Sequence, residues 1–291
     1  MNLKQLLISK IKTPSLIIKI TLISIVFIFA INIELNTLIN FSKHTLGKND
    51  ISSTLFILHI FSYFEIYAKY LIVALIMIIP DITQEPYLKH QNIIFNINRK
   101  KYFITTIKLI TLYILCFILW FILLTFIVSM FRVRFFDFTW TEIVKTMHIK
   151  TEFGSDMTLI SIPESATKYP FLLVFFLTLI KVYIGFLVIS LIAFYFSFKK
   201  DSPLAGVIVS FTLYLVSDLL FWNSRISWNI MGKSFTLSKL TYEYSLCTFF
   251  TFESVGVNYM DRIIHSFIYG VFIIGIFMIL IKRQFDKKDL C

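Results

Sequence analysis

Long apolar runs separated by shorter polar stretches make up most of this chain. Six runs reach the roughly 20 residues that a helix needs to cross a hydrocarbon layer about 30 Å thick. Apolar and polar residues do not alternate within the runs, which excludes the strands of a porin-type barrel. The pattern predicts an all-α integral membrane protein, one transmembrane domain over 1–291. The predicted spans are 16–39, 55–79, 103–130, 171–198, 204–222 and 263–281.

The composition agrees with a membrane location. Hydrophobic residues form 57% of the chain, charged residues form 15%, and 33 residues are Phe. A soluble domain of 291 residues does not need so much apolar material to fill its core. The lipid bilayer is therefore the first predicted partner.

The distribution of Lys and Arg predicts the orientation of the chain. These residues are more than twice as dense in one set of connecting segments as in the other. By the positive-inside rule the dense set is cytoplasmic, so both termini are predicted inside and 131–169 and 223–261 become outer loops. Anionic head groups account for most of the net charge of +11, so no nucleic acid is needed. The dense set is 1–15, 81–102, 199–202 and 282–291, and the sparse set is 40–54, 131–169 and 223–261.

The first 15 residues predict a short helix on the inner membrane surface. Apolar residues recur at helical spacing opposite Lys4 and Lys12, and the pattern ends at Pro14. A frayed, charged terminus is the alternative interpretation of the same residues.

Motifs for catalysis or metal binding are missing from the sequence. Cys116, Cys247 and Cys291 have no metal-ligand or redox spacing, and no His pairs with a carboxylate at a zinc-type interval. The run MGKS at 231–234 ends like a phosphate-binding loop, but Ser227 stands where that motif needs its first Gly. We therefore expect no catalytic residue, no metal and no cofactor in this chain, and no enzymatic activity of its own.

The polar stretch that follows the second span is longer than a connection between antiparallel helices requires. Pro80 closes the span, Glu85-Pro86 is typical of a helix start, and a basic turn at 98–101 leads into the third span. We expect a short helix across the inner surface, and its length indicates a partner. Its faces carry Tyr87, Leu88, Gln91, Ile94, Phe95 and Asn98.

These residues resemble a loop in a known family. Glu85, the apolar pair Ile94-Phe95, the basic residues 99–101 and Lys108 are similar to the loop between helices 2 and 3 of ABC-2-type transporter permeases. Six spans with both ends inside, a flat N-terminal helix and the short polar turn at 197–206 agree with that family. In the family the first loop carries a coupling helix that contacts the ATP-binding subunit.

The resemblance implies a function and partners. The chain would be the permease subunit of an ATP-driven exporter for a hydrophobic or amphipathic substrate, such as a peptide, a lipid-like molecule or a drug. Two separate ATP-binding subunits would bind ATP and Mg, and a second permease, the same chain or a different one, would complete the pathway. The implied ATPase contacts are Glu85, Tyr87, Leu88, Gln91, Ile94, Phe95, Asn98 and Arg99 in the first loop, and Lys199, Lys200 and Asp201 in the second.

Charges inside the spans are the candidate pathway residues, because an unpaired charge at the centre of a bilayer is costly. Glu65 and Lys69 lie one helical turn apart and either neutralise each other or mark a substrate site. Lys181 reaches Glu65, meets an acidic group of a partner subunit or faces a wet pathway. Asp218 and Arg262 are expected where water is available, near the outer ends of their spans.

Two other classes of function remain open. One is a secondary carrier without an ATPase, using Glu65, Lys69 and Lys181, although no internal repeat supports it. The other is a non-transporting sensor or assembly subunit. An intramembrane enzyme would need paired acids or a metal cluster, which the spans lack.

The composition is typical of an AT-rich bacterial source, so we expect the bacterial plasma membrane. The apolar loop 223–261 is expected to dip back into the bilayer as a gate or to lie at the head groups.

Overall fold

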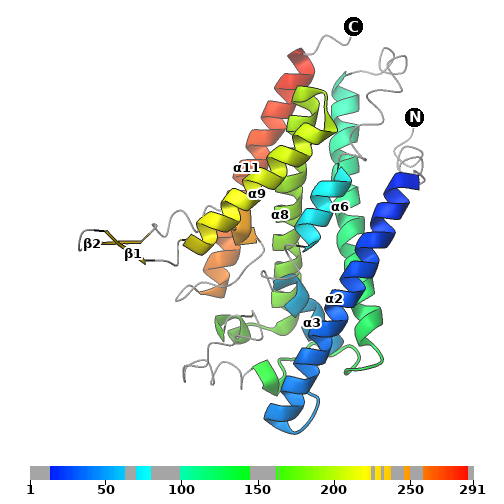
Figure 1. Ribbon diagram of the computed structural model, residues 1–291, viewed down its shortest axis with the longest axis vertical. Helices are drawn as coiled ribbons and strands as arrows, with labels where there is room; N and C mark the ends of the chain where they lie inside the picture. Colours follow the sequence, from blue (N-terminus) through cyan, green and yellow to red (C-terminus); the bar gives the residue numbers. More distant parts are fainter. Residues whose placement is uncertain are drawn as a thin grey trace.

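The structure is a computed structural model of the chain, and it describes residues 14–62, 70–79, 99–144, 162, 164–223, 227–230, 233–236, 246–249 and 258–287. Long helices run side by side along the longest axis (Figure 1). Four are long and apolar enough to cross a membrane, which confirms a helical membrane protein. They are α2 (Pro14–Leu46), α6 (Arg99–Ser129), α8 (Phe171–Lys200) and α11 (Tyr259–Lys287).

The remaining predicted spans are made of shorter apolar helices. The predicted second span contains α3 (Ser53–Ser62) and a helix at Tyr70–Ile79, and residues 63–69 between them lie outside the described residues. The predicted fifth span is α9 (Pro203–Asn223), of which Pro203–Ser217 is the apolar part. The described residues therefore give four spanning helices where the hydropathy pattern predicts six.

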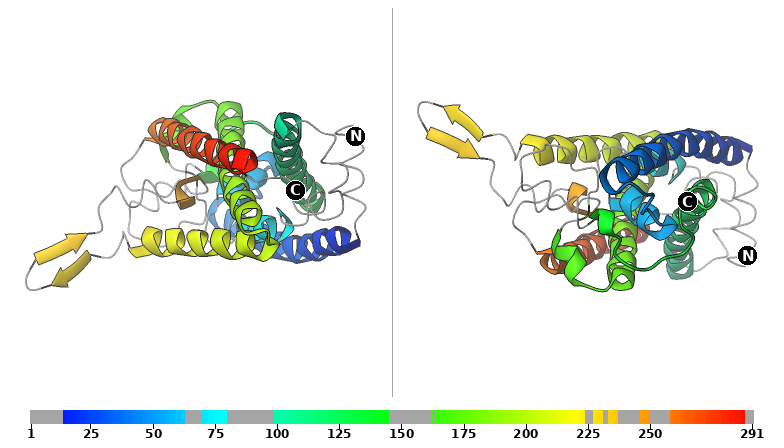
Figure 2. Two further views of the ribbon diagram at one scale, coloured as in Figure 1. Left: turned by 90° about the horizontal axis from the view of Figure 1, so that it is seen from above. Right: turned by 90° about the horizontal axis from the view of Figure 1, so that it is seen from below.

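Helix α8 is the centre of the bundle. It packs against α3, α6, α9 and α11. Half of the most apolar stretch of α8 is buried inside the protein, whereas the buried share of the corresponding stretch is 22% in α2 and 17% in α11. The end-on views place α2 and α11 on opposite sides of the bundle (Figure 2). Both present large apolar side chains outward, such as Phe29, 69% exposed, and Ile268, 68% exposed. Such faces are stable in contact with lipid tails.

Local backbone chemistry sets where two of the long helices end. Gly47 follows α2 with φ +68°, and its N–H donates to the Lys43 carbonyl at 2.9 Å. Asp201 follows α8 in the same left-handed region, and its N–H and that of Ser202 both donate to the Ser197 carbonyl. Both are the left-handed caps that stop an α-helix. Pro203 then starts α9 directly, because proline is preorganised for a first helical turn.

Polar contacts join α2, α3 and α6 at the end of the bundle that is lower in Figure 1. Arg134, beyond α6, pairs with the backbone of Ile51 and Ser53 and forms an ion pair with the buried Asp50 at 3.1 Å. Asp50 also accepts the Ile143 N–H at 3.3 Å. These contacts fix the loop before α3 to the segment after α6.

The prediction of an all-α membrane protein is confirmed, and the structure adds one short feature in the loop between α9 and α11. Strands β1 (Ser227–Ile230) and β2 (Lys233–Thr236) form an antiparallel hairpin in which Ser227 pairs with Thr236. The hairpin stands away from the helices (Figure 1). Hydropathy could not reveal it, because only four residues form each strand. It also places Lys233 of the MGKS run in a strand, whereas a phosphate-binding loop opens a helix.

Candidate functional site

Several predicted site residues lie outside the described residues. These are the candidate charges Glu65 and Lys69, and the loop contacts Glu85, Tyr87, Leu88, Gln91, Ile94, Phe95 and Asn98. Arg99 is the first residue of α6. The predicted N-terminal surface helix, 1–13, and residues 145–161 of the predicted outer loop are also outside the description. The first predicted ATPase contact stays a prediction.

The second predicted contact is the turn between α8 and α9. It is exposed and capped by Asp201, and it consists of Lys199, Lys200 and Asp201. It lies at the end of the bundle where α2 and α6 begin and α11 ends (Figure 1). The Lys199 ammonium lies 5.6 Å from the centre of the Tyr195 ring, and this ring is 5.8 Å from that of Phe277 on α11. The turn is thereby connected to α11 as well as to its own two helices.

Gly206 lets α9 lie directly against α8. A Cβ atom at this position would overlap the Ser197 hydroxyl and the Ala193 carbonyl oxygen. Because the second of these is backbone, no change of rotamer relieves the overlap. The close approach joins α8, the turn and α9 into one hairpin, so a force applied at the turn acts on both helices.

Two cations are buried where α8 meets α11. Lys181 is 1% exposed and Arg262 is 5% exposed. The expectation that Arg262 meets water is therefore wrong. The physical reason is that α11 begins at Tyr259, so Arg262 lies within its first turn on a face packed against protein. Asp218, its predicted counterpart, is part of α9.

Hydroxyl groups extend this polar region, which we call the α8–α11 seam and define as Thr178, Lys181, Tyr259, Arg262 and Ser266. The Tyr259 hydroxyl donates to the Val174 carbonyl at 3.1 Å and lies 3.4 Å from the Thr178 hydroxyl. Ser266 is fully buried, and its hydroxyl has no hydrogen-bond partner among the described residues. The seam combines two buried basic side chains with hydroxyl groups, so it is a polar region within an otherwise apolar part of the bundle.

The 3-10 turn η3 (Leu246–Phe249) returns from the loop after α9 into the bundle. Phe249 is fully buried and stacks on Tyr269 of α11 with 5.6 Å between ring centres. It also contacts Gly270, whose added Cβ would lie 3.2 Å from the Phe249 ring. Gly270 is about 16 Å along α11 from Tyr259 at 1.5 Å per residue, so η3 reaches deep between the helices. The described part of this loop thus packs against protein, which makes irregular backbone tolerable there. Whether the loop enters the bilayer as a gate or lies at the head groups stays a prediction.

Sequence reasoning missed a buried hydrogen bond between α2 and α3. The carboxylate of Glu34 lies 3.0 Å from Nε2 of His59, and their side chains are 11% and 1% exposed. The signal was present, because Glu34 is the one acid in the run 16–39 and His59 the one His in 55–79. Sequence alone does not show that these two positions face each other.

Among the described residues, no group of three or more His, Cys, Asp or Glu is placed to hold a metal ion. No protein-family model, curated protein or solved structure matches this chain. The assignment to ABC-2-type permeases therefore remains a hypothesis that rests on the loop residues.

Proposed function

We propose that this chain is the transmembrane permease subunit of an exporter driven by a separate ATPase. It would cross a bacterial plasma membrane six times with both ends in the cytoplasm. The observation that carries the proposal is the α8–α9 turn, a charged, exposed and capped turn at the end of the bundle's central helix. A charged and capped turn of this kind is a suitable contact for a partner subunit that moves the helices of the bundle.

The packing around the turn supports a mechanical role. Gly206 holds α9 against α8, and Tyr195 connects α8 to α11. Closure of two ATP-binding subunits on ATP and Mg would therefore move α8, α9 and α11 together. Rigid-body motion about packed interfaces is a common way to alternate between two states. The polar ties of Asp50 and Arg134 at the opposite end would keep α2, α3 and α6 together as a second unit.

Alternating access by these two units requires a second permease, the same chain or a different one, to close the pathway. The α8–α11 seam is the candidate for the polar part of that pathway, because buried charge within a span is seldom kept without a use. The apolar surroundings favour a hydrophobic or amphipathic substrate such as a peptide, a lipid-like molecule or a drug.

Affinity purification from the native membrane in mild detergent tests the proposal. We expect an ATP-binding protein to co-purify and the complex to hydrolyse ATP. The double variant Lys199→Glu, Lys200→Glu should retain at least about tenfold less ATPase, since like charges placed across an interface cost several kcal/mol.

The matched control reverses two exposed lysines at the opposite end, Lys43→Glu with Lys168→Glu, and should retain the ATPase. If the wild-type chain purifies without any ATPase in several detergents, the proposal fails. If both double variants lose the ATPase equally, the turn is not the contact.

A secondary carrier without an ATPase is the second candidate, and the buried charges favour it. Lys181, Arg262, Glu34 and His59 all lie inside apolar helices, as ion-coupling groups do in carriers. A chain that purifies alone, together with proton uptake by vesicles that contain only this chain, would support the carrier.

A further inference from the structure

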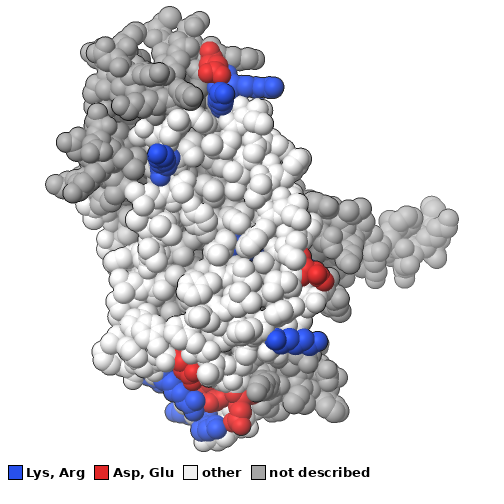
Figure 3. Space-filling view, turned by 180° about the vertical axis from the view of Figure 1, so that it is seen from behind, with Lys and Arg blue, Asp and Glu red and all other residues white. Residues whose placement is uncertain are grey.

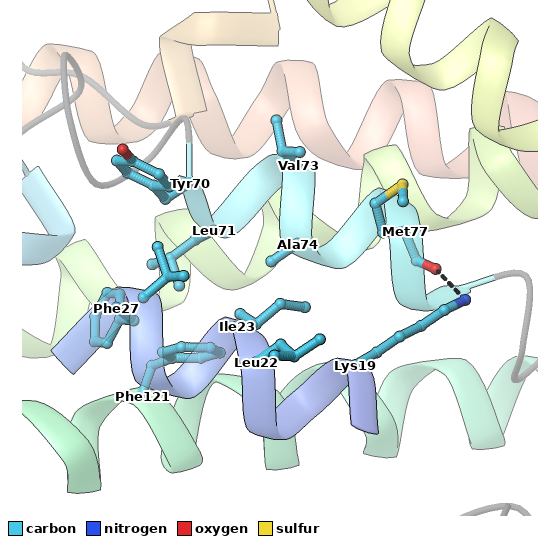
Figure 4. A pocket seen from close by; sticks show the side chains of 11 residues that line it. Lys19, Leu22, Ile23, Phe27, Tyr70, Leu71, Val73, Ala74, Met77 and Phe121 are labelled. Atoms are coloured by element: carbon cyan, nitrogen blue, oxygen red, sulfur yellow. Dashed lines mark hydrogen bonds between the residues drawn. The ribbon is translucent and has the colours of Figure 1, made fainter. Parts of the chain in front are cut away.

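An elongated apolar groove lies on the side of the bundle, between α2 and the helix Tyr70–Ile79. Its volume is about 610 Å³, within the range of small-molecule sites, and Phe121 of α6 contributes to its floor. Figure 4 shows α2 side chains along one side and those of Tyr70–Ile79 along the other. The groove is separate from the α8–α11 seam and takes no part in the proposed transport mechanism.

The groove opens to the outside of the bundle and is not a gap inside the protein. Leu22 is 59% exposed and Val26 is 51% exposed on the α2 side, and Met77 is 49% exposed on the other. Phe27 and Phe121 are buried, and their rings meet edge to face at the far end with 4.6 Å between centres. An apolar trough with exposed rims at this level would contact lipid chains directly.

A single positive charge marks one end of the groove. Lys19 is the one charged residue among its described lining residues, and its ammonium donates to the Met77 carbonyl at 3.4 Å (Figure 4). This carbonyl lies in the last turn of the helix Tyr70–Ile79, where a cation is favoured by the helix dipole. The contact holds the lysine at the mouth of the groove.

The depth of Lys19 suits a lipid head group. It lies five residues after Pro14, about 7 Å along α2, while Phe27 is about 12 Å further along at 1.5 Å per residue. A lysine this close to the end of a span can extend its ammonium to the membrane surface. The groove therefore has its charge near the surface and its apolar part directed toward the bilayer centre.

We propose that this groove binds an anionic phospholipid of the leaflet at the N-terminal end of α2. One acyl chain would lie along Leu22, Val26 and Ala74, and the phosphate would meet Lys19. A second copy of this chain is a poorer occupant, because a two-fold contact would place the same groove on both sides, and the described lining residues include no acid to meet Lys19. A neutral lipid brings no net negative charge to Lys19.

Native mass spectrometry on the full chain tests the proposal, after reconstitution with equal amounts of phosphatidylglycerol and phosphatidylcholine. We expect the wild type to retain phosphatidylglycerol in preference. Lys19→Gln should lower the ratio of the two retained lipids about fivefold, the effect of one lysine at an anionic lipid surface. Leu22→Trp should lower the retention of both lipids because it fills the groove.

Two matched controls should behave as the wild type. Lys108→Gln removes another exposed lysine near the same end of the bundle, on α6. Ile25→Trp adds the same bulk to an equally exposed position of α2 outside the groove. Equal lipid retention in all five proteins would overturn the proposal. So would a dimer of the wild type that Leu22→Trp dissociates, which would make a second copy the occupant.

Discussion

Glu34 and His59 form a buried hydrogen bond between α2 and α3. Removing one partner of a buried pair leaves the other in a poor environment, and this commonly costs about 3–5 kcal/mol in soluble proteins. Glu34→Leu alone and His59→Leu alone should therefore each lower the midpoint of thermal unfolding in lipid nanodiscs. The double variant should recover most of the loss. Additive losses in the double variant would show that the two side chains do not depend on each other.

Asp50 and Glu142 give a comparison between a buried and an exposed carboxylate in one polar cluster. Asp50 is 4% exposed and holds both Arg134 and the Ile143 N–H, so Asp50→Ala should destabilise the protein by about 1–3 kcal/mol. Glu142 pairs with Lys48 at 2.9 Å on the surface, where water screens the pair. Glu142→Ala should leave the unfolding midpoint nearly unchanged at neutral pH, and an equal loss in both variants would contradict the assignment.

The Lys48–Glu142 pair also has a defined pH dependence. Its hydrogen bond, and then the charge of Glu142, raise the pKa of Lys48 above the ordinary value of 10.5. A raised lysine pKa means that the folded state holds the proton more tightly than the unfolded state. The contribution of the pair is thus complete at neutral pH and is lost only as the pH rises through the raised pKa.

Some charged residues of the candidate site could be identified from sequence, but the residues that they contact depend on how the helices pack. Lys181 could be singled out because it stands alone in an apolar run. Its proximity to Arg262, and that of Glu34 to His59, depends on which helix faces meet. The spans are apolar around their whole circumference, so no amphipathic stripe indicates the inward face. The candidate charged residues could therefore be predicted from the sequence, but the residues that they contact could not.

At the scale of elements, the hairpin of α8 and α9 depends on Gly206. Gly206→Ala should lower the unfolding midpoint and cost about 1–3 kcal/mol, because the new methyl group meets the Ala193 backbone oxygen. It should also reduce ATP hydrolysis by a co-purified ATPase, if the hairpin transmits its motion.

Gly275 of α11 is the matched control for this substitution. An added Cβ there meets nothing within 4 Å, and alanine is the better helix former by about 1 kcal/mol. Gly275→Ala should therefore be neutral or stabilising. Equal destabilisation by both variants would mean that Gly206 has no special contact.

Most element boundaries could be predicted, and each of the two main misses has a physical cause. The predicted spans 171–198 and 204–222 agree with α8 and α9 to within two residues at each end. Helix α2 continues seven residues beyond the predicted 39, to Leu46, because hydropathy marks the hydrocarbon layer while Gly47 marks the end of the helix. The hairpin β1–β2 was missed because four-residue strands give no reliable pattern.

At the scale of the whole molecule, charge separates the two ends of the bundle from its middle. Figure 3 shows that on one face the charged side chains gather toward the two ends, with a broad and mostly uncharged band between them. A band of this kind is what a bilayer requires. The two charged ends differ, since one carries the α8–α9 turn and the other the ties of Asp50 and Arg134. This difference is the basis for assigning the first end to an ATPase.

Site-specific photo-crosslinking in living cells tests this assignment most directly. A photoreactive amino acid would replace Lys199 in the turn, or Lys168 at the opposite end as a control, and crosslinked proteins would be identified by mass spectrometry. Our account predicts that position 199 captures an ATP-binding protein and position 168 does not. Capture of no ATPase from 199, or equal capture from both positions, would contradict it.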